Sequence, residues 1–179
     1  MMEDKKITRF DDFFPEEIYN ELVGTAKFLL KNGTMAFSTN AYWDHKIVKD
    51  SFPVLIHEIH KNSELFVKTK EQVESKTNFL VNEHDIMFYY WTRFSYIPWH
   101  RDQSYAAALT VYLNEEWHED WGGYFLYEKE NNDIGAIQPK RNLGLLQQGG
   151  VKHSTTSVHY NGNMRITVQV FLDKREKNA

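Results

Sequence analysis

The triplet His100-Arg101-Asp102 holds the residue types with the clearest chemical potential in this sequence. If the segment is extended, side chains alternate between the two faces of the strand, so His100 and Asp102 point to one side and Arg101 to the other. An imidazole and a carboxylate on one face supply two of the three ligands of a 2-His-1-carboxylate triad. Such a triad holds Fe(II) and leaves coordination positions open for substrates. Because the same pattern also occurs at exposed strand ends, a metal site needs a third ligand from elsewhere.

Three histidines downstream of Asp102 are candidates for the third ligand. His118 lies in a polar loop and would have to fold back toward the triplet. His153 follows a predicted strand and the Gly149-Gly150 turn, and it leads toward the last predicted strand. We favour His153, with His159 as the second choice.

Arg165 begins the last predicted strand and alternates with Thr167 and Gln169 on one of its faces. A buried arginine is costly unless an anion pairs with it. A bidentate salt bridge to a small dicarboxylate is a natural use of such a side chain. The alternative is a surface arginine, or a salt bridge to one of the chain's own acidic residues.

Composition limits the class of protein. The chain has 179 residues, of which 41% are hydrophobic and 15% aromatic, and this favours one globular domain with a sizeable core. The absence of cysteine excludes disulfides, zinc ribbons, iron–sulfur clusters and cysteine nucleophiles. A net charge of −4 argues against nucleic-acid binding through a basic surface. No signal peptide or membrane-spanning stretch is evident, so we expect a cytoplasmic protein without a membrane partner.

Helical patterns come first and strand patterns follow. Pro15, Glu16 and Glu17 indicate the start of a helix that ends near Gly33. The spacing of apolar residues predicts a second helix over Phe52–Val67, and Lys68–Asn82 either extends it or connects it to the next element. The predicted strands cover Ile7–Phe14, Ile86–Phe94, Ala106–Leu113, Tyr124–Tyr127, Gly135–Pro139, Asn142–Gln147 and Met164–Leu172.

This order predicts a mainly β fold, a sandwich or barrel with N-terminal helices as a buttress. We expect a single domain over residues 1–179, with a helical lead-in at about 10–82 and a β-core at about 85–172. The segments Thr34–Asp50 and Lys68–Asn82 are predicted to border the pocket.

The chain resembles the Fe(II)/2-oxoglutarate-dependent dioxygenases, and among them the prolyl-hydroxylase-like group. The resemblance covers about residues 86–172, and the lead-in Phe10–Lys31 also looks like that of the group. It rests on His100-Arg101-Asp102, Tyr112–Trp117, Gly122-Gly123, Pro139, His153, Val158 and Arg165. It implies a double-stranded β-helix, or jelly-roll, core.

The resemblance also implies a set of roles. His100, Asp102 and His153 would bind Fe(II), and Arg165 would bind the distal carboxylate of 2-oxoglutarate. The cofactor set is then Fe(II), 2-oxoglutarate and O₂, with release of succinate and CO₂. Tyr112 matches a position whose hydroxyl assists that carboxylate, and Tyr90 matches a pocket tyrosine. The presence of Asp102 favours hydroxylation over halogenation, because related halogenases lack this carboxylate.

Two other functions compete with a hydroxylase. One is a non-catalytic jelly-roll protein that binds a metal or small ligand. The other is a nucleic-acid demethylase of the same superfamily, but those enzymes usually carry a second arginine where this chain has Phe171. We therefore expect a small-molecule or peptide substrate, such as a prolyl residue, a free amino acid or a metabolite, and no nucleic acid.

Overall fold

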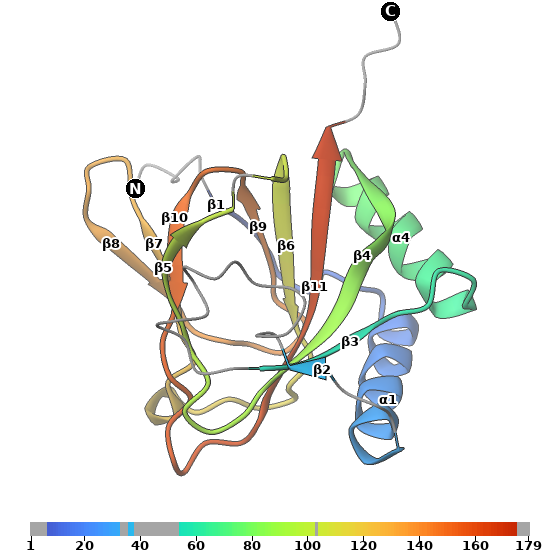
Figure 1. Cartoon of the computed structure of the whole chain (residues 1–179), viewed down its shortest axis with the longest axis horizontal. Coiled ribbons are helices and arrows are strands. Elements are labelled where there is room, and N and C mark those ends of the chain that lie inside the picture. The colour runs from blue at the N-terminus through green and yellow to red at the C-terminus, as the bar shows by residue number, and fades with distance from the viewer. Residues whose placement is uncertain (1–6, 33–35, 38–53, 103, 175–179) are drawn as a thin grey trace, which may run out of the picture.

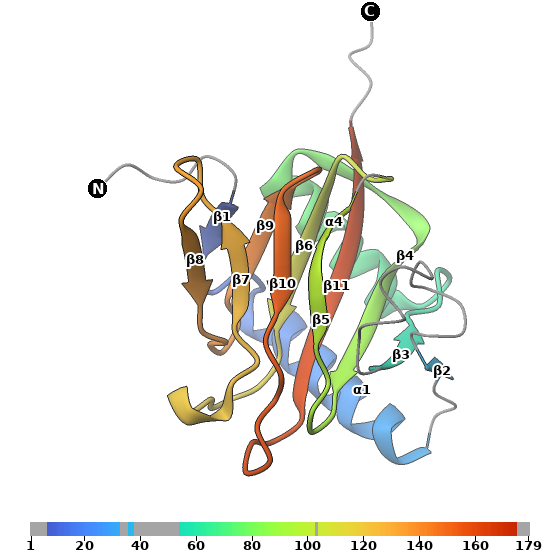
Figure 2. The ribbon, with the colours of Figure 1, turned by 60° about the vertical axis from the view of Figure 1, so that its left-hand side comes forward.

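Two antiparallel β-sheets face each other in the computed structural model, which describes residues 7–32, 36–37, 54–102 and 104–174 (Figures 1 and 2). The larger sheet has seven strands. In spatial order they are β1 (Ile7–Phe10), β9 (Gly144–Gln148), β6 (Ala107–Tyr112), β11 (Arg165–Lys174), β4 (Phe79–Trp91), β3 (Leu55–Glu58) and β2 (Ala36–Phe37). The smaller sheet has four strands, in the order β5 (Ile97–Arg101), β10 (Lys152–Thr155), β7 (Phe125–Glu128) and β8 (Ile134–Ile137).

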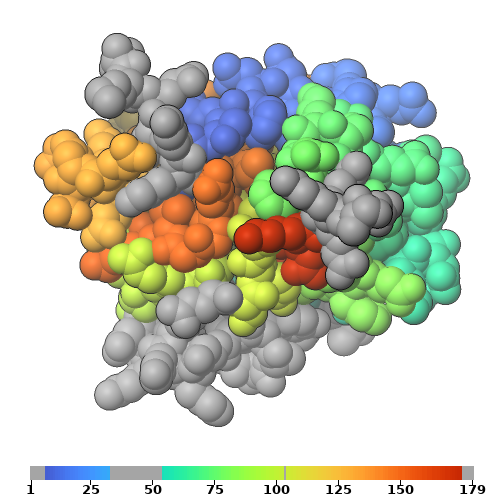
Figure 3. All heavy atoms as spheres, turned by 90° about the horizontal axis from the view of Figure 1, so that it is seen from above, coloured from blue at the N-terminus to red at the C-terminus, as the bar shows by residue number. Residues whose placement is uncertain are grey.

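Two helices cover the outer face of the larger sheet. Helix α1 (Glu16–Asn32) begins with two acidic residues, which suit the positive end of the helix dipole, and it confirms the first predicted helix. Helix α4 (Glu64–Thr77) begins at Ser63, whose Oγ accepts a hydrogen bond from the backbone N–H of Phe66 at 3.1 Å. Figure 3 shows the layers end on, with the red end of β11 between the orange strands and green α4.

The predicted helix over Phe52–Val67 is wrong in the part that the structure describes. Residues Leu55–Glu58 form β3, which pairs with β4, and the helix begins only at Glu64. Lys68–Asn82 is mostly α4 and the first residues of β4, so it lies with the helices and does not border the pocket. Apart from Ala36–Phe37, which form β2, the segment Thr34–Asp50 falls outside the described residues, and so does its predicted place beside the pocket.

Strand alternation gives the larger sheet two different faces. Val168, Val170 and Leu172 on β11 belong to the core under the helices, together with Tyr19 and Leu22 of α1. The opposite face of β11, which starts with Arg165 and continues with Gln169 and Phe171, lines a cavity between the sheets. These are the two faces predicted for the last strand, and the mainly β fold with a helical buttress is confirmed.

The strands of the smaller sheet complete the other wall of the cavity. Strand β10 lies between β5 and β7, and its His153 stands directly opposite His100 of β5. A short 3₁₀ helix, η1 (Glu119–Trp121), precedes Gly122, which bridges to Val158. Among the described helices, none is long and apolar enough to span a membrane.

Candidate functional site

A cavity of about 360 Å³ lies between the two sheets. Both sheets contribute to its wall, and the lining combines aromatic side chains with polar and charged ones. They include Met87, Tyr89, Trp91, His100, Asp102, Tyr105, Tyr112, Gln147, His153, Arg165, Gln169 and Phe171. A concave cavity in which aromatic walls surround convergent polar groups is typical of a site for a small ligand.

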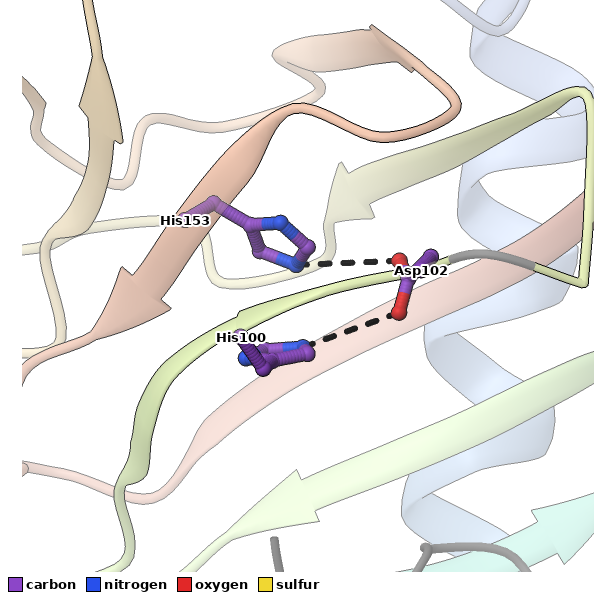
Figure 4. A group of neighbouring side chains, drawn as sticks. All are labelled: His100, Asp102 and His153. Atoms are coloured by element: carbon purple, nitrogen blue, oxygen red, sulfur yellow. Dashed lines mark ion pairs between the residues drawn. The ribbon is translucent and has the colours of Figure 1, made fainter.

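His100, Asp102 and His153 converge at one wall of this cavity (Figure 4). The Nε2 atom of His100 lies 3.6 Å from Oδ1 of Asp102, and Nε2 of His153 lies 3.7 Å from Oδ2. The centroids of the two imidazole rings are 4.1 Å apart. In the described part of the chain, no other group of three such side chains brings its ligand atoms this close.

Both histidines present Nε2 to the shared space because their other ring nitrogen is engaged. Nδ1 of His100 donates to the carbonyl of Pro98 at 2.8 Å, and Nδ1 of His153 donates to that of Val151 at 2.9 Å. This hydrogen bond to a backbone carbonyl is the usual way in which a metal-binding histidine is held in one tautomer. Two unprotonated Nε2 atoms and a carboxylate form a donor set that fits Fe(II).

Burial keeps His153 in the neutral form that a metal ligand requires. Its side chain is buried, and desolvation, assisted by neighbouring His100, lowers the pKa of the imidazole below its ordinary value. Arg101, between the two ligands, points outward to the carbonyl of Gly150 and to Glu128. The structure therefore confirms that His100 and Asp102 point to one side of the strand and Arg101 to the other.

Arg165 is a fully buried charge that also lines the cavity. Its guanidinium carbon lies 4.0 Å from the ring centroid of Trp91, and one terminal nitrogen donates to the carbonyl of Gly123. Nε has no hydrogen-bond partner, and no acidic side chain within the described ranges forms a salt bridge with it. Desolvation lowers the pKa of Arg165 to about 10, so the side chain stays charged at neutral pH.

Gly123 leaves room for this arginine. Its φ of +66° is a conformation that favours glycine, and a Cβ there would lie 3.3 Å from Cδ of Arg165. Tyr112 stands nearby, with its ring centroid 5.9 Å from the guanidinium carbon. Burial raises the pKa of Tyr112 to about 12, so its hydroxyl is a neutral hydrogen-bond donor.

The predicted role of Tyr90 in the pocket is wrong. Its neighbours Tyr89 and Trp91 line the cavity, but Tyr90 points to the other face of β4 and packs in the core under the helices. Its hydroxyl donates to the carbonyl of Ala26 on α1 at 3.0 Å. Strand alternation thus assigns Tyr90 to helix docking.

Tyr90→Phe should therefore lower the free energy of unfolding by about 1 kcal/mol, the typical net value of one hydrogen bond, with no effect on cosubstrate use. Chemical denaturation measures the first quantity, and succinate formation against 2-oxoglutarate concentration measures the second. A raised Michaelis constant for 2-oxoglutarate in Tyr90→Phe would contradict this assignment and indicate that Tyr90 contributes to cosubstrate binding.

The other two candidate histidines lie apart from this group. His159 is exposed in the loop between β10 and β11, and its Nδ1 accepts a hydrogen bond from the backbone N–H of Asn161 at 3.4 Å. His118 is exposed and packs its ring against Trp121. The structure therefore brings His153 to the pair, and neither alternative.

Gln147 and Trp91 belong to the site although no role was predicted for them. Gln147 lies on β9 and contacts both Asp102 and His153 through its amide nitrogen. One signal in the sequence pointed to it: alternation along Gly144–Gln148 puts a polar amide on the same face as apolar Leu145. Trp91 is recognisable only once the register between β4 and β11 sets it opposite Arg165.

Comparisons with known proteins agree with this geometry. Residues 86–173 match the family described as the 2OG-Fe(II) oxygenase superfamily, where 2OG stands for 2-oxoglutarate. No curated protein sequence matches the chain.

Several solved structures share the fold. A Pseudomonas putida prolyl-4-hydroxylase superposes with a TM-score of 0.75 at 13% identity, covering 95% of this chain and 93% of that one. A Trichoplax adhaerens prolyl hydroxylase, solved with a peptide of hypoxia inducible factor, gives 0.77 at 15% identity, with 94% and 84% covered. A viral collagen prolyl hydroxylase from Paramecium Bursaria Chlorella virus-1, solved with 2OG, gives 0.63 at 15% identity, with 96% and 97% covered.

The chain matches the 2OG-Fe(II) oxygenase superfamily over a region that contains the whole candidate site. It is an enzyme that depends on Fe(II), 2-oxoglutarate and O₂, and its fold is the predicted jelly-roll.

Proposed function

We propose that this enzyme is a hydroxylase, which uses 2-oxoglutarate and O₂ to oxidise a C–H bond of a prolyl or other peptidyl residue, an amino acid or a small metabolite. His100, Asp102 and His153 would hold Fe(II), and Arg165 would bind the distal carboxylate of 2-oxoglutarate. Bound Fe(II) supplies the activation of O₂ that couples decarboxylation of the cosubstrate to oxidation of the substrate.

One observation carries this proposal: one cavity is lined both by a group of three candidate ligands and by a buried guanidinium that has no salt-bridge partner among the described residues. A buried cation without an anion destabilises the folded protein, so its retention is best explained by a ligand that brings the anion. A guanidinium fork suits the two oxygens of a carboxylate. Tyr112 stands close enough to assist with its neutral hydroxyl.

The rest of the lining supports a substrate group that is uncharged. Phe171 stacks on Tyr105 with ring centroids 4.5 Å apart, and Met87 lies on the same part of the wall. Among the described lining residues, Asp102 is the only acid, so these residues offer no separate counter-charge for an ammonium group. Phe171 also replaces with an apolar ring the second arginine that the demethylase alternative would need.

The proposal is tested by adding Fe(II), 2-oxoglutarate and O₂ to the metal-free protein and measuring succinate. We expect slow succinate formation without substrate and faster formation with a matching one, screened over proline-containing peptides and free amino acids. Mass spectrometry should then find one added oxygen atom on the stimulating compound. Stimulation with a product that has gained no oxygen would contradict hydroxylation.

A further inference from the structure

Asp102 is held by a side chain from the opposite sheet. Nε2 of Gln147 on β9 donates a hydrogen bond of 2.8 Å to Oδ2 of Asp102, and the same nitrogen lies 3.3 Å from Nε2 of His153. The backbone of Gln147 is fixed on both sides, because it pairs with Ile7 of β1 and with Ala108 of β6. The amide therefore extends from a rigid position into the triad.

Asp102 itself lies at the end of its own sheet. The ladder between β5 and β10 ends with Arg101 opposite Lys152, and Asp102 follows it with one backbone contact, an N–H donated by Gly150 at 3.0 Å. Within the described ranges, Gln147 is the only group that donates a hydrogen bond to the carboxylate. Its orientation thus depends on the amide more than on its own strand.

The chemistry of an amide suits this position. An ionised carboxylate only accepts hydrogen bonds, so the NH₂ end of Gln147 must face Asp102 and the carbonyl end must point away. An amide donor also leaves the negative charge of Asp102 uncompensated, whereas a lysine or arginine there would compete with a divalent cation. Because Gln147 engages Oδ2, Oδ1 is the oxygen that remains free for a metal.

We propose that Gln147 is a positioning residue that makes Asp102 bind the metal through one oxygen and so keeps the other coordination positions available for cosubstrate and O₂. This inference rests on the proposed role of the triad. Hydrogen-bonding partners of metal ligands typically change metal affinity by about 10- to 100-fold when they are removed.

The test is a Co(II) titration of the metal-free protein, followed by visible absorption. Gln147→Leu keeps the approximate volume but removes the donor, and we expect its Kd for Co(II) to rise by about 10- to 100-fold. We also expect its Co(II) spectrum to change, because Asp102 is then free to bind through both oxygens. Gln148→Leu is the matched control, since Gln148 is the next residue of β9 and is exposed.

Gln147→Met serves as a second variant, because its unbranched side chain keeps the shape of glutamine more closely. An unchanged Kd and spectrum in either folded Gln147 variant would overturn the proposal. Loss of folding in both, with Gln148→Leu intact, would also overturn it by showing a purely structural role. Failure of the wild type to bind Co(II) would instead contradict the proposed triad, so the two failures are distinguishable.

Discussion

Alanine in place of His100, Asp102 or His153 should abolish Fe(II)-dependent succinate formation. The loss should exceed the roughly 100-fold effect of removing a hydrogen bond to a metal ligand. The physical reason is that the three ligand atoms lie within 4.8 Å of one another and each supplies one donor. Removing one leaves two donors, which hold a labile divalent cation poorly. Succinate formation and Fe(II) affinity under anaerobic conditions are the two measurements.

His159→Ala is the matched control for the histidine variants. It removes an exposed imidazole from the loop before β11, so we expect Fe(II) affinity and turnover to remain near those of the wild type. Circular dichroism should show that all four variants are folded. Loss of metal in His159→Ala with retention in His153→Ala would show that His159, and not His153, is the third ligand.

Long elements with a strong local pattern could be predicted from the sequence. Helix α1 has its acidic first turn and a regular apolar face, so its start and extent followed from local rules. Strand β11 alternates cleanly, so its two faces could be predicted without knowledge of its neighbouring strands. His100 and Asp102 were paired by the same rule, since only one residue separates them.

Features that depend on distant parts of the chain could not be predicted in this way. Residues 54–66 have apolar spacing that also fits a helix, but pairing with β4 makes Leu55–Glu58 a strand. Strand β10 is only four residues long and is stabilised by pairing with β5 and β7, so its local sequence does not predict it. The contact between Gln147 and Asp102 joins two sheets, so it depends on how the sheets pack. Tyr90 was placed wrongly because adjacent residues of a strand point to opposite faces, and the cavity face of β4 carries Tyr89 and Trp91 instead.

The position of Arg165 shows why a binding site can lower stability. Its pKa is lowered to about 10 by burial, which means that the folded state disfavours the charged form. A buried charge without a salt-bridge partner carries an uncompensated desolvation cost, and an apolar side chain of similar volume removes that cost. We therefore expect Arg165→Met to unfold at the same temperature as the ligand-free wild type or at a higher one, while binding to the cosubstrate is lost.

Arg165→Ala should raise the apparent Michaelis constant for 2-oxoglutarate by roughly 100- to 4,000-fold, because loss of one partner of a buried charge pair costs about 3–5 kcal/mol. Arg165→Lys should raise it less, since lysine keeps the charge but lacks the planar fork. Fe(II) affinity should be unchanged in both, because neither substitution removes one of the three candidate ligands. The measurement is succinate formation against 2-oxoglutarate concentration, with thermal unfolding in the presence and absence of 2-oxoglutarate as an independent measure of binding. If Arg165→Ala kept the wild-type dependence on 2-oxoglutarate, another cation would hold the distal carboxylate and the buried guanidinium would be structural.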